Sequence, residues 1–279
     1  MPPAPTLDEL RKAIDETDDE LLEILNRRAR LVQEVGAAKV RDGGGTYYFP
    51  ERERAIIDRL RSRNAGPFPD SAVRPVFQEV ISACLSMQAG VSVAYLGPEA
   101  TFTHQAVKRH FGTSASTAPC GSISAVFDEV ERGAVDHGVI PVENSTEGVV
   151  SHTLDSFFGS SLKISAEILV PIEQCLLVRR GLKESQIERV YSHPQALAQC
   201  RGWLQANLPK AALVDTASTA DAARSAHSDA AGAAIAAELA ARVYNLEILR
   251  QPIQDKSDNA TRFLVIGRHE PALSTDGDF

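Results

Sequence analysis

The stretch SACLSMQAGVSVAYLGPEATF, residues 82–102, contains the point at which the chain changes its hydrophobic period. Before Gly90, apolar residues recur at steps of three and four, as on one face of a helix. After Gly90, the short run VSVAYLG is rich in residues that favour strands and is followed by proline, which is typical of a strand that ends in a turn. The sequence therefore predicts two regions of different fold class, joined near Gly90.

The region before Gly90 is predicted to be all helical. Residues 7–41 contain no proline and one glycine, and Thr6 with Glu9 forms a capping-box pattern at their start. A helix of that length spans roughly 50 Å. Pro50 is expected in the first turn of a second helix, and a third helix is expected to begin near Ser71. The residues expected on the inner face of the third helix are Val73, Phe77, Ile81, Cys84 and Gln88. Because the long helix leaves an apolar face uncovered, we expect an interlocked homodimer.

The region after Gly90 is predicted to be an α/β fold with largely parallel sheets. Helical segments lie between most of its apolar runs, and ligands of such folds bind at strand ends or between lobes. The predicted strands after VSVAYLG are HGVIPVE, LKISAEILVPIEQCLLV, ERVYS, AALVD, GAAIA and ATRFLVIG.

The composition is that of an ordinary globular protein, with 279 residues, 43% hydrophobic and 24% charged. A formal charge of −8 argues against nucleic acid or an anionic membrane as the main partner. The four cysteines form no Cys-x-x-Cys pair, which argues against zinc and against a disulfide framework. No secretion signal and no long apolar run is visible, so we expect a cytoplasmic protein.

Three polar residues occupy helical positions whose phase is otherwise apolar, namely Arg28, Lys39 and Gln88, and Arg11 lies beside them. Long side chains at a helix edge would explain any one of them, because the charged end can reach water. A charge buried without a partner costs several kcal/mol, so a shared explanation for the set is a water-poor pocket for a small polyanion. Both interpretations remain open at this point.

The helical region resembles the all-helical chorismate mutase family over residues 6–89, through LDELRKAIDETDDELLEILNRRARLVQEVGAAK, PERER and VFQEVISACLSMQ. The resemblance implies that Arg11, donated across the dimer, Arg28 and Arg52 hold the two carboxylates of chorismate. It implies that Lys39 and Gln88 hydrogen-bond the ether oxygen and that Glu53 contacts the hydroxyl. Phe49 and Cys84 stand where an aspartate and a serine can occur, and Cys84 is counted among the chorismate-binding positions. Such a rearrangement needs positioning and electrostatic stabilisation, without a nucleophile.

Four segments of the second region place small polar side chains at strand ends: YLGPEATFTHQA, GVIPVENSTEGVV, VYSHPQALAQCRGWL and DNATRFLVIG. Each one taken alone is compatible with helix caps and turns. The segment Thr261-Arg262-Phe263 differs, because it opens a strand and needs no cap.

These segments resemble the prephenate dehydratase family across residues 91–268. The resemblance implies two α/β lobes of the periplasmic-binding-protein type, about 91–168 plus 251–268 and about 169–250, with the site in the cleft. It implies Thr261 as the catalytic hydroxyl and Asn144 and Gln195 as polar partners of prephenate. The other residues expected to line the site are Thr101, Ser145, Thr146, His193, Arg262 and Phe263. Arg262 is ranked below Thr261, since neighbouring side chains of a strand alternate between faces.

Two smaller expectations concern the same region. His104, His110, His137 and His152 show no metal-ligand spacing and are interpreted as structural or surface residues. Ala100 replaces a glycine that is common in the GPEGTF form of the motif, which makes the loop less permissive there.

Together the two resemblances predict a bifunctional enzyme of phenylalanine biosynthesis that converts chorismate to prephenate and then to phenylpyruvate, without metal or organic cofactor. The predicted domains are 1–90 and 91–268, followed by a polar tail, 269–279. Strings with the sense of GALV and ESRP, which mark a phenylalanine-sensing regulatory domain in this family, do not occur in the sequence, so no inhibition by phenylalanine is expected at such a domain. Two alternatives remain: a two-lobed small-acid sensor with a helical stalk, and a dehydratase whose mutase region is inactive.

Overall fold

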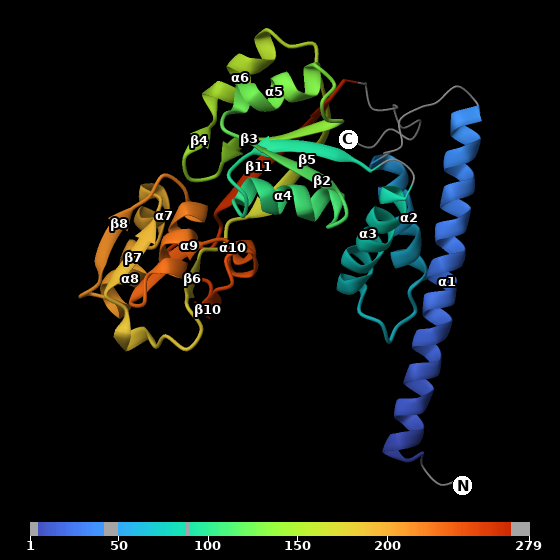
Figure 1. Ribbon diagram of the computed structural model, residues 1–279, viewed down its shortest axis with the longest axis horizontal. Coiled ribbons are helices and arrows are strands. Elements are labelled where there is room, and N and C mark those ends of the chain that lie inside the picture. The colour runs from blue at the N-terminus through green and yellow to red at the C-terminus, as the bar shows by residue number, and fades with distance from the viewer. Residues whose placement is uncertain (1–4, 42–49, 88–89, 269–279) are drawn as a thin grey trace. The chain divides into compact units, whose positions relative to one another are not determined.

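The computed structural model describes residues 5–41, 50–87 and 90–268, which divide into two compact units. The first unit contains helices α1–α3 and the segment Phe111–Ala115, and the second contains the strands and the remaining helices (Figure 1). The helices are α1 (Leu7–Arg41), α2 (Pro50–Arg63), α3 (Asp70–Ser86), α4 (Phe102–Phe111), α5 (Ile123–Glu131), α6 (Ser151–Phe158), α7 (Pro194–Gln199), α8 (Arg201–Asn207), α9 (Thr219–Ser228) and α10 (Glu238–Val243). The strands are β1 (Ser92–Leu96), β2 (Ser116–Cys120), β3 (His137–Asn144), β4 (Gly148–Val149), β5 (Lys163–Pro171), β6 (Cys175–Val178), β7 (Arg189–Ser192), β8 (Ala212–Asp215), β9 (Gly232–Ala236), β10 (Glu247–Arg250) and β11 (Ala260–Gly267).

The long first helix begins with the capping box that the sequence predicts. The Thr6 N–H donates to Glu9 Oε2 at 2.7 Å, and the Glu9 N–H donates to Thr6 Oγ1 at 3.3 Å. Two of the backbone N–H groups at the start of α1 are thereby satisfied. The third helix buries Val73, Ile81 and Cys84, three of the residues expected on its inner face.

The first helix packs on α3 but keeps much of its apolar surface in solvent. Leu10, Ile14, Leu21 and Leu31 are each about half exposed. An apolar stripe of this extent is unusual on a folded monomer, since burying it would stabilise the protein by roughly 25 cal/mol per Å². None of the helices in the described part of the chain is long and apolar enough to cross a membrane.

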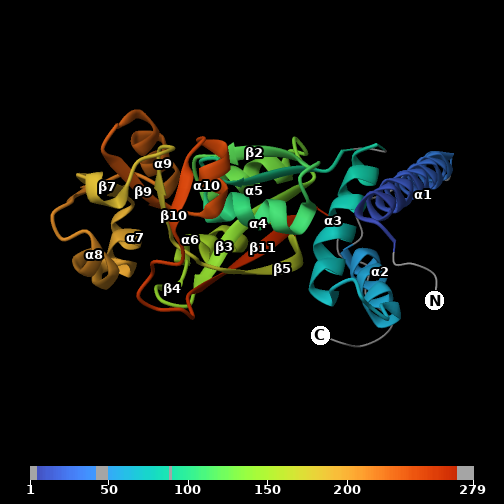
Figure 2. The ribbon, with the colours of Figure 1, turned by 90° about the horizontal axis from the view of Figure 1, so that it is seen from below.

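The second unit has two lobes, each built on one sheet, and the two lobes are visible on either side of α10 in Figure 2. The strand order is β2-β1-β3-β11-β5 in one sheet, with β4 paired to β3, and β10-β6-β9-β7-β8 in the other. Residues of α7 and α8 pack on one face of the second sheet, and those of α9 and α10 pack on its other face. The predicted two-lobed α/β fold is confirmed.

The expectation of largely parallel sheets is wrong, because both sheets are mixed. Strand β11 runs antiparallel to both of its neighbours, β3 and β5, and β6 runs antiparallel to β9 and β10. The run LKISAEILVPIEQCLLV, which was predicted as one strand, divides into β5 and β6, which belong to different sheets. Strands that return from the other lobe need no helical crossover, so their direction is free of the rule that makes βαβ units parallel.

This antiparallel pairing positions two residues of the candidate site. It brings the first residues of β11 beside the last residues of β3, with Thr261 directly opposite Asn144. The two residues are 117 positions apart in the sequence. Their proximity therefore comes from sheet register alone.

Candidate functional site

A cavity of about 450 Å³ lies in the second unit, with walls from both lobes. Of the eight prephenate-site residues predicted in that region besides Thr261, five line it. Together with Thr261 the predicted residues in the wall are Thr101, Asn144, His193, Gln195 and Phe263. Such a cavity, largely pre-formed and lined by a few convergent polar groups, has the form and size of a small-molecule site.

At the centre of this wall, the Asn144 side-chain amide holds the Thr261 hydroxyl. Asn144 Nδ2 donates to Thr261 Oγ1 at 2.7 Å and to Asn259 Oδ1 at 3.1 Å. Asn144 Oδ1 accepts from the backbone N–H groups of Thr146 and Glu147 at 2.9 and 3.1 Å. Because a backbone N–H can only donate, these two bonds fix which end of the amide faces Thr261.

This orientation determines which hydrogen bond the Thr261 hydroxyl can still make. Its oxygen accepts the bond from Asn144, and among the hydrogen bonds of the described residues it donates none. Thr261 is 9% exposed and lies in the cavity wall. Its proton is therefore available to a group in the cavity, and a buried donor of this kind is strong because water does not compete.

Ser145, Thr146 and Arg262 are not in the cavity wall. The hydroxyls of Ser145 and Thr146 donate to Asn259 Oδ1 at 3.3 and 3.4 Å, so they hold the residue beside Asn144. Arg262 lies on the exposed side of β11 and forms ion pairs with Glu143 and Glu167, at 3.7 and 3.3 Å. Alternation along the strand turns its side chain away from Thr261 and Phe263.

Six polar residues of the wall were missed by the sequence reasoning. They are Thr103, Glu147, Gln174, Gln199, Ser218 and Thr219. Gln174 Nε2 donates to Gln199 Oε1 at 3.1 Å, and Gln174 is 2% exposed. A glutamine inside the apolar run that spans β5 and β6 was a usable signal, since such a side chain must find buried partners.

The predicted residues at the start of α7 cap that helix and also face the cavity. His193 Nδ1 accepts from the Gln195 N–H at 3.3 Å, in the N-cap position. The N-terminus of this six-residue helix, and with it Gln195, therefore borders the cavity. Among the described residues, no three His, Cys, Asp or Glu side chains are grouped so that they could hold a metal ion.

The structure brings the predicted chorismate residues of the first unit together less fully than the predicted prephenate residues of the cavity. Arg11 on α1 has a side chain 67% exposed and meets only Asp8 of its own helix, at 3.5 Å. Arg52 on α2 is also exposed. Arg28 is half-buried, and within the described residues its Nη1 atom is buried without an acceptor. The side chain of Lys39 and the whole of Gln88 lie outside what the structure describes.

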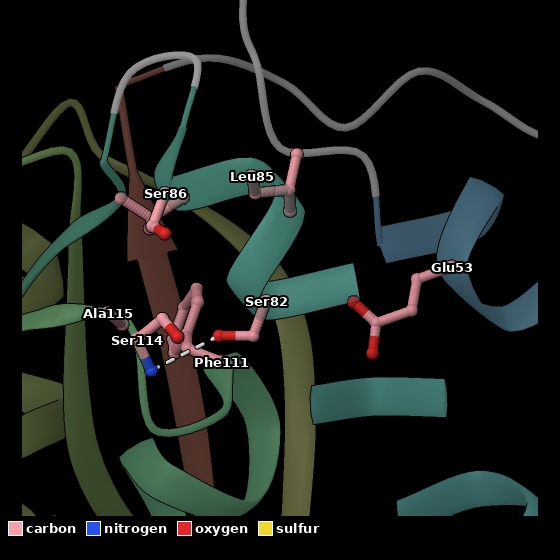
Figure 3. A pocket seen from close by; sticks show the side chains of 8 residues that line it. Glu53, Ser82, Leu85, Ser86, Phe111, Ser114 and Ala115 are labelled. Carbon is pink, nitrogen blue, oxygen red and sulfur yellow. Dashed lines mark hydrogen bonds between the residues drawn. The ribbon is translucent and has the colours of Figure 1, made fainter. Parts of the chain in front are cut away.

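Glu53 lies in a small pocket of the first unit, and Figure 3 shows its carboxylate pointing from α2 toward α3. The segment Phe111–Ala115 closes the pocket, with the Ser114 N–H donating to Ser82 Oγ at 3.3 Å. Burial raises the pKa of Glu53 to about 7, and the nearby positive charge of Arg74 opposes the shift. Cys84 is buried on α3 and does not line this pocket.

The segment Phe111–Ala115 is fastened to α3 by close contacts. Glu79 Oε2 accepts from Thr113, at 2.6 Å from the hydroxyl and 3.2 Å from the N–H. Gly112 has a φ of +76°, and a Cβ added there would lie 2.4 Å from Ser82 Cβ. Only glycine combines this backbone conformation with so close an approach.

The structure defines a protein with an all-helical unit followed by a two-lobed α/β unit whose lobes both line a cavity of small-molecule size. Residues 10–89 match the family model for chorismate mutase type II, and residues 93–271 match that for prephenate dehydratase. The chain therefore belongs to the family of bifunctional chorismate mutase/prephenate dehydratase proteins.

Similar proteins of known name agree with this assignment. A bifunctional chorismate mutase/prephenate dehydratase of Aquifex aeolicus is 47% identical over 95% of this chain and 74% of its own length. The protein of the same name from Pseudomonas aeruginosa is 44% identical over 94% of this chain and 73% of its own. A crystal structure of prephenate dehydratase in complex with L-Phe from Arthrobacter aurescens is 38% identical, with a TM-score of 0.61, over 66% of this chain and 63% of that one. The chain thus spans about three quarters of the length of the two bifunctional relatives.

Proposed function

We propose that this protein rearranges chorismate to prephenate in its helical unit and converts prephenate to phenylpyruvate in the α/β unit. The observation that carries the second activity is the 2.7 Å bond from Asn144 to Thr261 in the wall of the cavity. Both family models match the same chain, which supports two consecutive reactions of phenylalanine biosynthesis.

In the dehydratase reaction, prephenate loses its ring carboxylate as carbon dioxide while the ring hydroxyl leaves, and one proton is taken up to form water. The electron pair of the breaking C–C bond enters the ring, which becomes aromatic. Thr261 donates its hydrogen bond to the departing hydroxyl, as a general acid whose oxygen is held by Asn144. Gln195, His193 and Thr101 line the same cavity and supply polar contacts to the substrate.

In the mutase reaction, Arg28, Arg52 and the Arg11 of a partner subunit bind the two carboxylates of chorismate. Lys39 and Gln88 stabilise the ether oxygen as the C–O bond breaks, and Glu53 contacts the hydroxyl, with Cys84 nearby. This chemistry needs a fixed substrate conformation and donors aimed at the developing charge. Arg28 supports the proposal most directly, because its buried Nη1 has no acceptor among the described residues and a substrate carboxylate would provide one.

The exposed stripe of α1 supports a homodimer. Exposed apolar residues occupy positions 7, 10, 14, 21, 24, 31 and 35, and Thr17 and Arg28 complete an uninterrupted alternation of steps of three and four. That period is the signature of a helix seam that packs on a second helix. A second copy of α1 would cover the apolar stripe and bring another Arg11 to the helical site. Light scattering should therefore give twice the chain mass.

A cytoplasmic location is part of the same proposal. The described cysteines are free, and Cys84, Cys175 and Cys200 are buried thiols, as expected in a reducing compartment. Cell fractionation followed by immunodetection tests it.

The direct test supplies purified protein with chorismate and follows three quantities: loss of chorismate absorbance, acid-labile prephenate, and phenylpyruvate. The expected result is sequential appearance of prephenate and phenylpyruvate. Binding of either acid without turnover would favour the small-acid sensor instead. Conversion of added prephenate without any loss of chorismate would favour a dehydratase with an inactive mutase region.

A further inference from the structure

Next to the cavity wall lies a backbone position that its residue does not favour. Ala100 has a φ of +68°, in the left-handed region that costs a non-glycine residue roughly 1 kcal/mol. Its side chain is fully buried and packs in the core cluster of the second lobe, with Leu177 and Ala236. Thr101, the next residue, lines the cavity, so the conformation of Ala100 decides where Thr101 lies.

His104, which the sequence reasoning left as structural or surface, is the side chain that meets this position. Its Nδ1 atom accepts a hydrogen bond from the Ala100 N–H at 3.1 Å. The ring is 2% exposed and stacks on Tyr95, with centroids 4.7 Å apart and planes 12° apart. Its place is therefore fixed on one side by an aromatic ring and on the other by the backbone it holds.

The hydrogen bond defines the state of the imidazole. An Nδ1 atom that accepts cannot carry a proton, so the neutral ring is protonated at Nε2. Burial lowers the pKa of His104, Lys108 lowers it further and Glu99 opposes them, which favours the neutral form. The Nε2 atom is buried and has no hydrogen-bond partner in the described part of the chain. Among the described residues, the bond from the Ala100 N–H to Nδ1 is therefore the hydrogen bond that the imidazole makes.

Hydrogen bonds within the same turn hold the Thr101 side chain. Thr101 Oγ1 donates to the Pro98 carbonyl at 3.0 Å, and the His104 N–H donates back to Thr101 Oγ1 at 3.4 Å. Both the backbone and the side chain of His104 therefore act on the Ala100–Thr101 pair.

We propose that His104 is a positioning residue of the dehydratase site, whose Nδ1 atom holds Ala100 in the left-handed conformation and thereby fixes Thr101 in the cavity wall. This inference rests on the dehydratase function proposed above. It concerns a residue that need not touch the substrate, and it depends on alanine at position 100. Glycine adopts the left-handed conformation without help, so the requirement for His104 should weaken in an Ala100→Gly background.

The test begins with two amide variants that differ in where they place an acceptor. In His104→Asn the Oδ1 atom falls near the position of Nδ1, whereas in His104→Gln the amide reaches toward the position of Nε2. We expect dehydratase kcat to fall less than about fivefold for Asn and about 10–100-fold for Gln and for His104→Leu, since small misplacements in a site cost about that much. Equal loss in Asn and Gln variants that are both folded would overturn the proposal.

Rescue by glycine is the second readout. Ala100→Gly alone should keep dehydratase kcat within about threefold of the wild-type value, and adding it to His104→Gln should recover at least about tenfold. A merely structural histidine predicts additive losses instead. The mutase rate of the same proteins is the control for folding and concentration, because His104 belongs to the other unit. Additive losses with an unchanged mutase rate would contradict the positioning role.

A measurement that does not depend on catalysis separates the role of His104 from the proposed dehydratase activity. Nitrogen NMR of the wild-type protein reports the tautomer of His104 independently of any turnover. The expected signal at neutral pH is a neutral ring with its proton on Nε2. A proton on Nδ1, or a charged ring, would overturn the inference even in an active enzyme, whereas the expected tautomer in a protein without dehydratase activity would remove only the functional assignment.

Discussion

The two units of this protein differ in how their candidate polar residues are arranged. In the α/β unit, Thr261, Asn144, Gln195 and Thr101 come from distant parts of one chain and line one cavity. In the helical unit, Arg11 is exposed, and Arg28 buries a nitrogen that has no acceptor among the described residues. Among the described residues, the first arrangement brings its candidate groups together within a single chain, and the second does not.

The difference follows from the elements themselves. A sheet brings strands that are far apart in the sequence into register, so one chain can surround a ligand. The helix α1 has 35 residues and leaves an apolar stripe exposed, which is typical of a helix that packs on a second helix. Sites on long helices are therefore expected to be shared between subunits, and sites at strand ends to be self-contained.

The largest expected effect is on the self-contained site. Thr261→Val keeps the size of the side chain and removes the hydroxyl, so dehydratase kcat should fall by about 10²–10⁴-fold. The mutase rate, measured on the same sample, should stay unchanged. A dehydratase rate within a few-fold of the wild type would show that the hydroxyl is not the proton donor.

The comparison is tested most directly by mixing subunits. Arg11→Ala and Arg28→Ala should each lower the mutase rate by about 10²–10³-fold, as loss of one charge-stabilising donor does. After the two variants are unfolded together and refolded, half of the dimers are mixed and one of their two sites holds both arginines, so about a quarter of the wild-type rate should return.

The matched control mixes two variants of the dehydratase site, Thr261→Val and Asn144→Ala. Both residues line the cavity of one chain, so no dehydratase rate should return after refolding together. Recovery of dehydratase activity in this pair, or no recovery of mutase activity in the arginine pair, would contradict the proposed difference between the two units.

A moderate effect is expected for the stability of the helical unit. The pKa of Glu53 is raised on folding to about 7, so the folded unit binds this proton more tightly than the unfolded chain. The associated stability is full below about pH 4.5 and is lost as the pH rises to about 7 and above. Glu53→Gln should remove this loss and raise the stability at about pH 8 by about 1–3 kcal/mol, discounted for the partial exposure of the group.

Urea denaturation followed by circular dichroism at several pH values measures this effect. Glu51→Gln is the control, because Glu51 is an exposed carboxylate on the same helix. A wild-type stability that does not change between about pH 5 and pH 8 would mean that Glu53 is solvated in the protein.

The smallest effect is expected at Arg262. Its ion pairs with Glu143 and Glu167 lie on the exposed side of β11, and exposed pairs of this kind contribute about 0–1 kcal/mol. Arg262→Gln should therefore change dehydratase kcat/KM by less than about fivefold, because the ion pairs contribute little. A loss as large as that of Thr261→Val would place Arg262 in contact with the substrate.

Much of the architecture was predictable because it depends on local patterns. The capping box of Thr6 and Glu9, the inner face of α3 and the change of period near Gly90 are all readable over a few residues. The residues of the site were predictable to a lesser degree. Thr261 and Asn144 were found through the family motif, whereas Gln174 and Gln199 were missed because their hydrogen bond joins two segments 25 residues apart.

His104 and Arg262 show why some roles resist sequence reasoning. His104 was interpreted as a structural or surface residue, and the positioning role proposed for it depends on the φ of Ala100, which no pattern of residues displays. Arg262 belongs to the same motif as Thr261, but strand alternation directs it to the other face.

The sequence by itself determined the two fold classes, the long helix with its repeating apolar seam, and the membership of a bifunctional family. These follow from periodicity and from motifs that are contiguous in the chain. Only the tertiary structure decided that β11 runs antiparallel to β3, that Thr261 consequently meets the Asn144 amide, and that Phe111, Ser114 and Ala115 line one pocket with Glu53. The physical reason is that the direction and register of strands that return from another lobe are set by packing across more than a hundred residues, and no local propensity encodes them.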